Sequence, residues 1–145
     1  MTSIAQRIIA ALEESSNTTM VDDAMLDAAF LFEKARGLPP CGWSDEVVRS
    51  NLSQDEMRRL RDAVAVFVER NGIGSWTLGK CADPSLKPVL TAVLRRQLHG
   101  DASELFQALI ALDNLGEPVF QGAASRSILD EQCIRAFAAH YLDRQ

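Results

Sequence analysis

The segment from Asp101 to Gly116 (DASELFQALIALDNLG) constrains the fold most, because it carries a start signal, an apolar stripe and a stop signal for one helix. The Asp101 carboxylate can cap the first turn, Glu104 can reach back to the N–H of the capping residue, and Gly116 suits the left-handed residue that ends a helix. Apolar side chains recur at three- and four-residue spacing: Leu105, Phe106, Ala108, Leu109, Ile110, Ala111 and Leu112. A helix this apolar must be covered on several sides, so the rest of the chain is expected to supply further helices.

Capping signals and helical periodicity divide the remaining sequence into those helices. We expect helices over about residues 4–14, 21–36, 54–70, 84–98 and from 128 onward, with shorter turns after Ser44 and around 75–78 and 117–121. No run alternates with a two-residue period, so no sheet is expected. The predicted fold class is all-α: one domain over residues 1–145 with about six to eight antiparallel helices, for which a solenoid-like C-terminal part is one option. Capping boxes are predicted for Ser3 with Gln6, Thr19 with Asp22, Ser53 with Glu56 and Ser127 with Asp130.

Apolar spacing predicts an inward face on each of these helices. In the helix over about 21–36 the inward residues are expected to be Met25, Leu26, Ala29, Phe30 and Phe32. In the last helix they are expected to be Leu129, Cys133, Ile134, Phe137, Ala138 and Tyr141.

Apolar content and cysteine spacing indicate the compartment. No stretch reaches the roughly 18 apolar residues that a membrane span needs, and charges interrupt the N-terminus where a signal peptide would be apolar. The cysteines Cys41, Cys81 and Cys133 fit neither a disulfide framework nor a C-x-x-C metal site. We therefore predict a cytoplasmic protein whose cysteines are reduced and structural.

The net charge of −5 is concentrated in the N-terminal part of the chain. Residues 1–56 hold ten carboxylates and four basic side chains, a balance of −6, whereas the rest of the chain holds ten against eleven. Such a field repels nucleic acid and anionic lipid and favours a basic partner. We expect no nucleic-acid or membrane partner, and the sequence leaves the oligomeric state open.

The segment from Gly74 to Cys81 (GSWTLGKC) resembles a phosphate-binding loop without completing it. Cys81 stands where such a loop needs Ser or Thr for Mg²⁺, and the preceding element is predicted to be a helix rather than a strand. His99 and His140 belong to no catalytic or metal-ligand motif. The sequence therefore predicts no catalytic residue, no cofactor site and no metal site.

Basic clusters on predicted helix surfaces are Arg58, Arg59 and Arg61, and Arg95 and Arg96. With a pI of about 5.0, a nucleic-acid role is disfavoured, and we expect pairing with helix-face carboxylates such as Asp55 and Asp62.

Trp43 and Trp76 lie in the two longest predicted connections rather than on helical stripes. Tryptophan is over-represented among energetic anchors of protein interfaces, and plugging a loop onto the core is an equally good explanation for each residue. Trp43 is the one surrounded by N-terminal acids in the sequence. The predicted partner-binding residues are Asp22, Asp23, Asp27, Trp43, Asp45, Glu46, Asp55 and Glu56.

The phrase LDNLGEP, residues 112–118, resembles the end of the second helix in HEAT-type helical repeats. The resemblance covers about residues 84–142 and implies stacked antiparallel helices; no second copy follows at a fixed period. In size and charge the chain also resembles the small acidic immunity proteins that bacteria pair with toxins, many of which are basic nucleases. That resemblance implies a non-enzymatic inhibitor. A helical enzyme or small-molecule-binding domain that uses buried carboxylates, and a structural adaptor, remain as alternatives.

Overall fold

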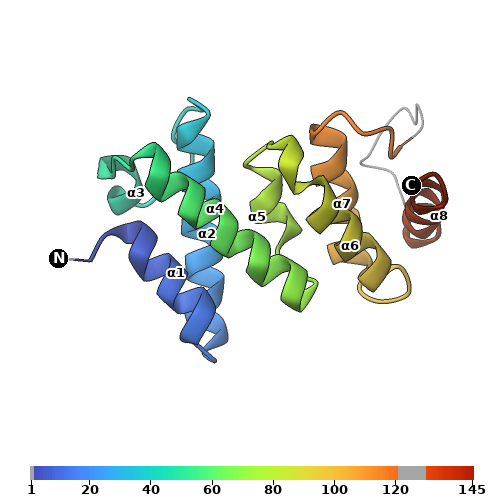
Figure 1. Ribbon diagram of the computed structural model, residues 1–145, viewed down its shortest axis with the longest axis horizontal. Helices are drawn as coiled ribbons and strands as arrows, with labels where there is room; N and C mark the ends of the chain where they lie inside the picture. Colours follow the sequence, from blue (N-terminus) through green and yellow to red (C-terminus); the bar gives the residue numbers. More distant parts are fainter. Residues whose placement is uncertain (1, 121–129) are drawn as a thin grey trace.

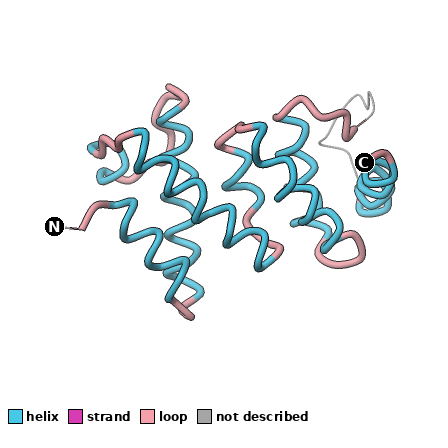
Figure 2. The backbone as a smooth tube through the Cα atoms, viewed as in Figure 1, coloured by secondary structure: helices cyan, strands magenta, loops and turns pink. Residues whose placement is uncertain are grey.

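Helices make up all the regular structure of residues 2–120 and 130–145, the residues that the computed structural model describes (Figure 2). The described residues form eight α-helices and one 3₁₀ turn, which confirms the all-α prediction. The elements are α1 (Ile4–Glu14), α2 (Thr18–Ala35), α3 (Asp45–Arg49), α4 (Gln54–Asn71), α5 (Ser75–Gly79), the 3₁₀ turn η1 (Pro84–Leu86), α6 (Lys87–Gln97), α7 (Ala102–Asn114) and α8 (Glu131–Asp143).

Most helix starts lie where the capping signals place them. Ser3 and Ser53 form complete capping boxes with Gln6 and Glu56. The predicted box of Thr19 with Asp22 is wrong: the side chain of Asn17 accepts from the N–H of Met20 at 3.2 Å, so α2 begins at Thr18. Asparagine is among the best N-cap residues, and Asn17 lies two residues before Thr19, so the helix starts at the earlier of the two positions.

The start of α7 also differs from its prediction. Asp101 caps it by accepting from the N–H of Glu104 at 3.0 Å. The Glu104 carboxylate does not return to the capping residue; it accepts from the backbone N–H of Gly74 at 3.1 Å. The N–H of Asp101 donates instead to the side-chain oxygen of Gln97 at 3.0 Å. A side chain expected to act locally therefore joins α7 to the start of α5.

α4 and α7 are the two helices around which the others pack, one in each half of the molecule (Figure 1). In the N-terminal part α4 packs against α1, α2, α5 and α6, whereas α7 packs against α5, α6 and α8. One continuous hydrophobic cluster contains residues from α1 to α8, as a single domain requires. The apolar residues of α7 that are fully buried are Leu105, Ala108, Leu109, Ala111 and Leu112.

The inward face of α2 is rotated relative to its prediction. Leu31 is buried, whereas Leu26, expected in the core, is 43% exposed. Met25, Ala29 and Phe32 are buried as predicted, and Ala24 and Ala28 complete the buried stripe. The apolar stripe of α2 is wider than the surface that neighbouring helices cover, which leaves Leu26 facing solvent.

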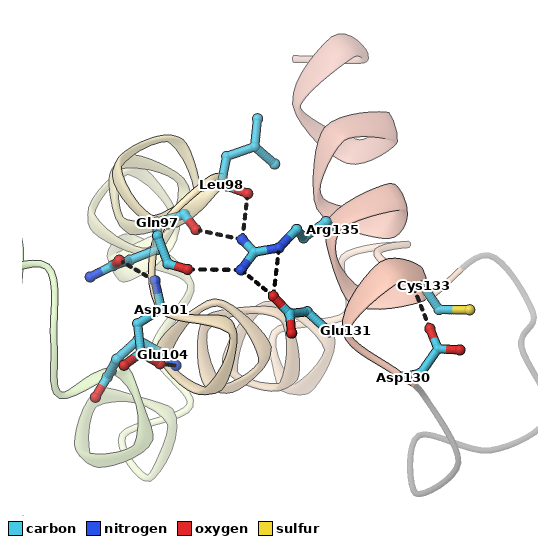
Figure 3. Close-up of polar contacts among 9 residues, drawn as sticks. Gln97, Leu98, Asp101, Glu104, Asp130, Glu131, Cys133 and Arg135 are labelled. Atoms are coloured by element: carbon cyan, nitrogen blue, oxygen red, sulfur yellow. Dashed lines mark hydrogen bonds and ion pairs between the residues drawn. The ribbon is translucent and has the colours of Figure 1, made fainter.

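The last helix, α8, is held to the end of α6 by Arg135 (Figure 3). Its guanidinium donates to the backbone carbonyls of Leu98 at 2.7 Å and Gly100 at 2.8 Å, and more weakly to that of Gln97 at 3.5 Å. The same group binds Glu131 at 2.7 Å. These contacts satisfy carbonyls that have no partner inside α6.

Several predictions fall between α7 and α8. Residues 117–120 are not helical, and the predicted turn through 121 continues outside the described residues. The predicted cap Ser127 and the inward Leu129 also lie outside them. Asp130 caps α8 by accepting from the N–H of Cys133 at 2.8 Å. Cys133 itself is exposed, which contradicts its predicted inward position.

Candidate functional site

The N-terminal half of α2 lies between two grooves. The first, between α1 and α2, has a volume of about 580 Å³; the second, between α2 and α5, has about 350 Å³. Asp23 lines both of them, because it lies on the ridge where they adjoin. We call them the α1–α2 groove and the α2–α5 groove.

Acidic side chains gather at the α1–α2 groove. Asp23 and Asp27 are four residues apart and therefore share one face of α2. Glu46 of α3 approaches Asp27 from outside the helix and forms an ion pair with Arg7 of α1. Met20, which is 53% exposed, adds an apolar surface to the same groove.

The pKa of Asp27 is raised above its ordinary value. Partial burial is the main cause, and the charge of Glu46 adds to it; Arg7 acts in the opposite direction, and Asp23 raises the pKa further. Glu46 and Asp23 together raise the pKa of Asp27 more than Arg7 lowers it. The structure thus brings Asp23, Asp27 and Glu46, three of the predicted site residues, to one place.

The α2–α5 groove combines exposed apolar side chains with acids. Leu26, Ile73 and Trp76 are 43%, 42% and 39% exposed. Asp22 and Asp23 form its α2 edge, and neither makes a hydrogen bond or ion pair with another described residue. Apolar surface rimmed by unpaired charge is typical of a protein-binding site.

Glu104 forms the far wall of the α2–α5 groove. Burial raises the pKa of its carboxyl, while the hydrogen bond from the Gly74 N–H acts in the opposite direction. Gly74 has a φ of +94°, and an added Cβ would lie 2.4 Å from the Met25 methyl. Only glycine therefore allows the chain to turn here against α2.

Three predicted site residues lie elsewhere in the fold. Asp55 pairs with Arg58 and Arg59 on its own helix, as predicted from their spacing. Glu56 closes the capping box of α4. Asp45 is exposed in the first turn of α3, where a carboxylate favours the helix start. Only Asp45 among them has a carboxylate without a described hydrogen bond or ion pair.

The two tryptophans differ in burial. Trp43 is half-buried against the core, and its Nε1–H donates to Glu33 at 3.4 Å. Trp76 is exposed in the α2–α5 groove, with the Lys80 ammonium 5.0 Å from its ring centroid. Sequence position alone did not show that α5 brings Trp76 beside the acids of α2.

The glycines of the incomplete phosphate-loop pattern have packing roles. Gly79 lies against α7, where an added Cβ would be 3.3 Å from that of Ala111. The Lys80 ammonium lies 3.7 Å from the Glu33 carboxylate. Packing between helices therefore explains why glycine and lysine occur at positions 79 and 80.

Cysteines and histidines show no shared site among the described residues. Cys41 and Cys133 are exposed. Cys81 is half-buried, and burial raises the pKa of its thiol to about 12. Both histidines are exposed, and no group of three or more metal-ligating side chains occurs in residues 2–120 and 130–145.

The helices of this same part of the chain are either too short or too polar to span a bilayer. Comparison with protein-family models, with curated proteins and with solved structures finds no match to this chain.

Proposed function

We propose that this chain is a non-enzymatic protein-binding module that receives a basic protein partner on the N-terminal half of α2. One observation carries the proposal: two grooves adjoin at Asp23, and unpaired carboxylates lie directly beside exposed Leu26, Ile73 and Trp76. The acids attract the partner from a distance, and the apolar side chains supply the surface to be buried.

The chemistry of the surface defines the partner. The opposing surface should carry arginine or lysine side chains, because negative charge there would be repelled by Asp22, Asp23 and Asp27. Trp76 is the apolar anchor of this surface, in place of the predicted Trp43. The size of the chain and its net charge of −5 support the further proposal of an immunity-type inhibitor that neutralises a basic toxin such as a nuclease.

The first experiment captures partners from the native host with three baits in parallel. The baits are the wild-type protein, the triple variant Asp22→Lys/Asp23→Lys/Asp27→Lys, and a matched control that reverses Glu13, Glu69 and Asp143, which are exposed and line neither acidic groove. We expect a basic protein to be captured by the wild type and the control but not by the α2 variant. The binding kinetics of that protein are then measured by surface plasmon resonance.

Association is expected to slow steeply as salt rises, because charge steering is screened over about 8–10 Å, while dissociation changes little. The α2 variant should reduce the association rate and the affinity by about 100-fold or more, as three attractive contacts become repulsive. Normal binding by the α2 variant, together with loss of binding when exposed residues of α6–α8 are changed, would contradict the proposal.

A second candidate function draws on the C-terminal helices. α7 packs against the preceding α6 and the following α8, an order that supports the proposed likeness to a HEAT-type repeat and an adaptor role. An adaptor would bind two different proteins at once. Recovery of two distinct partners, one lost with the α2 variant and one retained, is the outcome that favours it.

A further inference from the structure

A third pocket, with a volume of about 410 Å³, lies at the opposite end of α2 from the acidic grooves. The last turn of α2, the first two turns of α4 and the loop after α5 enclose it. Its distinguishing side chains are Arg36, Arg58 and Arg61, so we call it the arginine pocket. Three arginines and one acid, Asp83, line this pocket.

The walls of the arginine pocket are apolar. Phe32 contributes from the core side of α2, Leu52 from the loop before α4, and Met57 from the first turns of α4. Cys81 completes this surface, and because burial raises the pKa of its thiol to about 12, it remains uncharged at neutral pH. A ligand can therefore bury an apolar body against these side chains.

Charge in the pocket is only partly balanced within the protein. Asp83 is the acid that lines it, and it binds Arg61 at 2.7 Å; Asp62, outside the lining, pairs with the same arginine at 3.0 Å. Arg36 uses one nitrogen to donate to the carbonyl of Lys80 at 3.1 Å, and Arg58 pairs with Asp55. Arginine has five N–H donors, so Arg36 and Arg58 keep donors that no described residue occupies.

We propose that the arginine pocket binds a small organic molecule that carries a carboxylate on an apolar body. Arginine forks match carboxylate geometry with two parallel hydrogen bonds, which places the anionic group of the ligand at Arg36 and Arg58. The apolar body then lies on Phe32, Leu52 and Met57. The pocket volume is in the range of small-ligand sites, about 300–1,000 Å³.

This site is independent of the proposed protein-binding surface. It has the opposite charge, it uses the other end of α2, and it shares no lining residue with the two acidic grooves. The small-molecule alternative predicted from the sequence uses buried carboxylates as the binding groups, whereas this site uses arginines.

Methionine methyl groups provide a separate reporter for each groove. Met57 lines the arginine pocket, Met20 the α1–α2 groove and Met25 the α2–α5 groove. The protein, labelled with ¹³C at the methionine methyl groups, is titrated with octanoate as a linear carboxylate and with 2-naphthoate as an aromatic one. We expect at least one of them to shift the Met57 signal in a saturable manner and to leave those of Met20 and Met25 in place.

Octanol and octylammonium test the role of the charge. Both keep the apolar chain and lack the carboxylate, so neither should saturate the Met57 shift at the concentrations where octanoate does. Absence of any Met57 shift with both carboxylates, or an equal shift with octylammonium, would overturn the proposal.

Adjacent arginines supply a matched pair of variants. Arg58 and Arg59 both pair with Asp55 and are both largely exposed, but only Arg58 lines the pocket. Arg58→Gln and Arg36→Gln should each weaken carboxylate binding by about tenfold, whereas Arg59→Gln should leave it unchanged. Equal losses with Arg58→Gln and Arg59→Gln would show that only the overall charge acts, which contradicts a built site.

Discussion

The N-terminal half of α2 and the C-terminal helices α6–α8 use charged side chains in opposite ways. At α2, Asp22 and Asp23 point to solvent without a described hydrogen bond or ion pair. At the other end Arg135 binds backbone carbonyls of Leu98 and Gly100 (Figure 3). No described hydrogen bond or ion pair ties Asp22 or Asp23 to the rest of the fold, so their position at this surface is better explained by what approaches from outside.

A second cluster in the C-terminal part, around Glu117, also uses charge to link elements of the fold. The hydroxyl of buried Tyr141 donates to Glu117 at 2.5 Å, and the Lys87 ammonium lies 3.0 Å from the same carboxylate. The hydrogen bond from Tyr141, followed by that from Lys87, lowers the pKa of Glu117. Charge in this region serves to join α6, the segment after α7, and α8.

The sharpest test of this contrast uses the two tryptophans. Trp76→Ala is expected to weaken the captured partner's binding by about 2 kcal/mol or more, and to lower the free energy of unfolding by less than Trp43→Ala does. Trp43→Ala should do the reverse: it removes a half-buried side chain from the core and should lower the free energy of unfolding by about 1–3 kcal/mol. Calorimetry of binding and urea unfolding measure the two quantities.

Each variant is the control for the other, because both lose a tryptophan side chain, Trp43 from the connection before α3 and Trp76 from α5. If Trp43→Ala reduces affinity and Trp76→Ala does not, the anchor is Trp43 and the α2–α5 groove is not the interface.

A somewhat smaller effect is expected at Arg135. Arg135→Ala leaves the carbonyls of Leu98 and Gly100 without their charged donor and should lower the free energy of unfolding by about 2 kcal/mol. Partner affinity should not change, since α8 is distant from α2 along the molecule (Figure 1). Urea unfolding followed by circular dichroism measures the loss.

Arg144→Ala is the control for Arg135, because Arg144 is exposed and its side chain makes no hydrogen bond or ion pair with a described residue. It should change stability by less than about 0.5 kcal/mol. Equal losses in the two variants would mean that general charge at α8, rather than the carbonyl contacts, stabilises the C-terminal part.

The smallest effect is expected from Asp27→Asn, which should raise the free energy of unfolding where the variants above lower it. Its pKa is raised in the folded protein, so its carboxylate form opposes folding and the penalty appears as pH rises through that pKa. Asp27→Asn should therefore match the wild type near pH 3 and exceed its stability at pH 7, by less than about 1 kcal/mol because solvent screens the half-buried group. Partner binding should weaken at the same time.

Chemical unfolding across this pH range provides the measurement, with Asp55→Asn as the counterpart. Asp55 pairs with Arg58 and Arg59, so its variant should gain no stability at pH 7. A loss of stability in Asp27→Asn would show that the carboxylate is a structural group and remove it from the binding surface.

Local signals made much of this fold predictable. The boxes at Ser3 and Ser53 depend on residues three positions apart, and the apolar period of α7 was read within one segment. The start of α2 differs from its prediction for an equally local reason: Asn17, a competing cap residue, lies two positions before Thr19.

The candidate sites depend on contacts that no local pattern contains. Periodicity showed that Leu26 is apolar but not that neighbouring helices would leave it uncovered. Trp76 meets the acids of α2 only because α5 packs against that helix. Arg36 and Arg58 are likewise 22 positions apart in the chain and are joined by tertiary packing alone.

The hydrogen bond from Gly74 to Glu104 has a consequence for the entropy of binding. It fixes the segment that leads into Trp76 to the first turn of α7 before any partner arrives. A loop ordered in advance does not have to lose conformational freedom on association, so more of the contact energy contributes to affinity. We therefore expect the backbone around Trp76 to have the same conformation in the free and bound states.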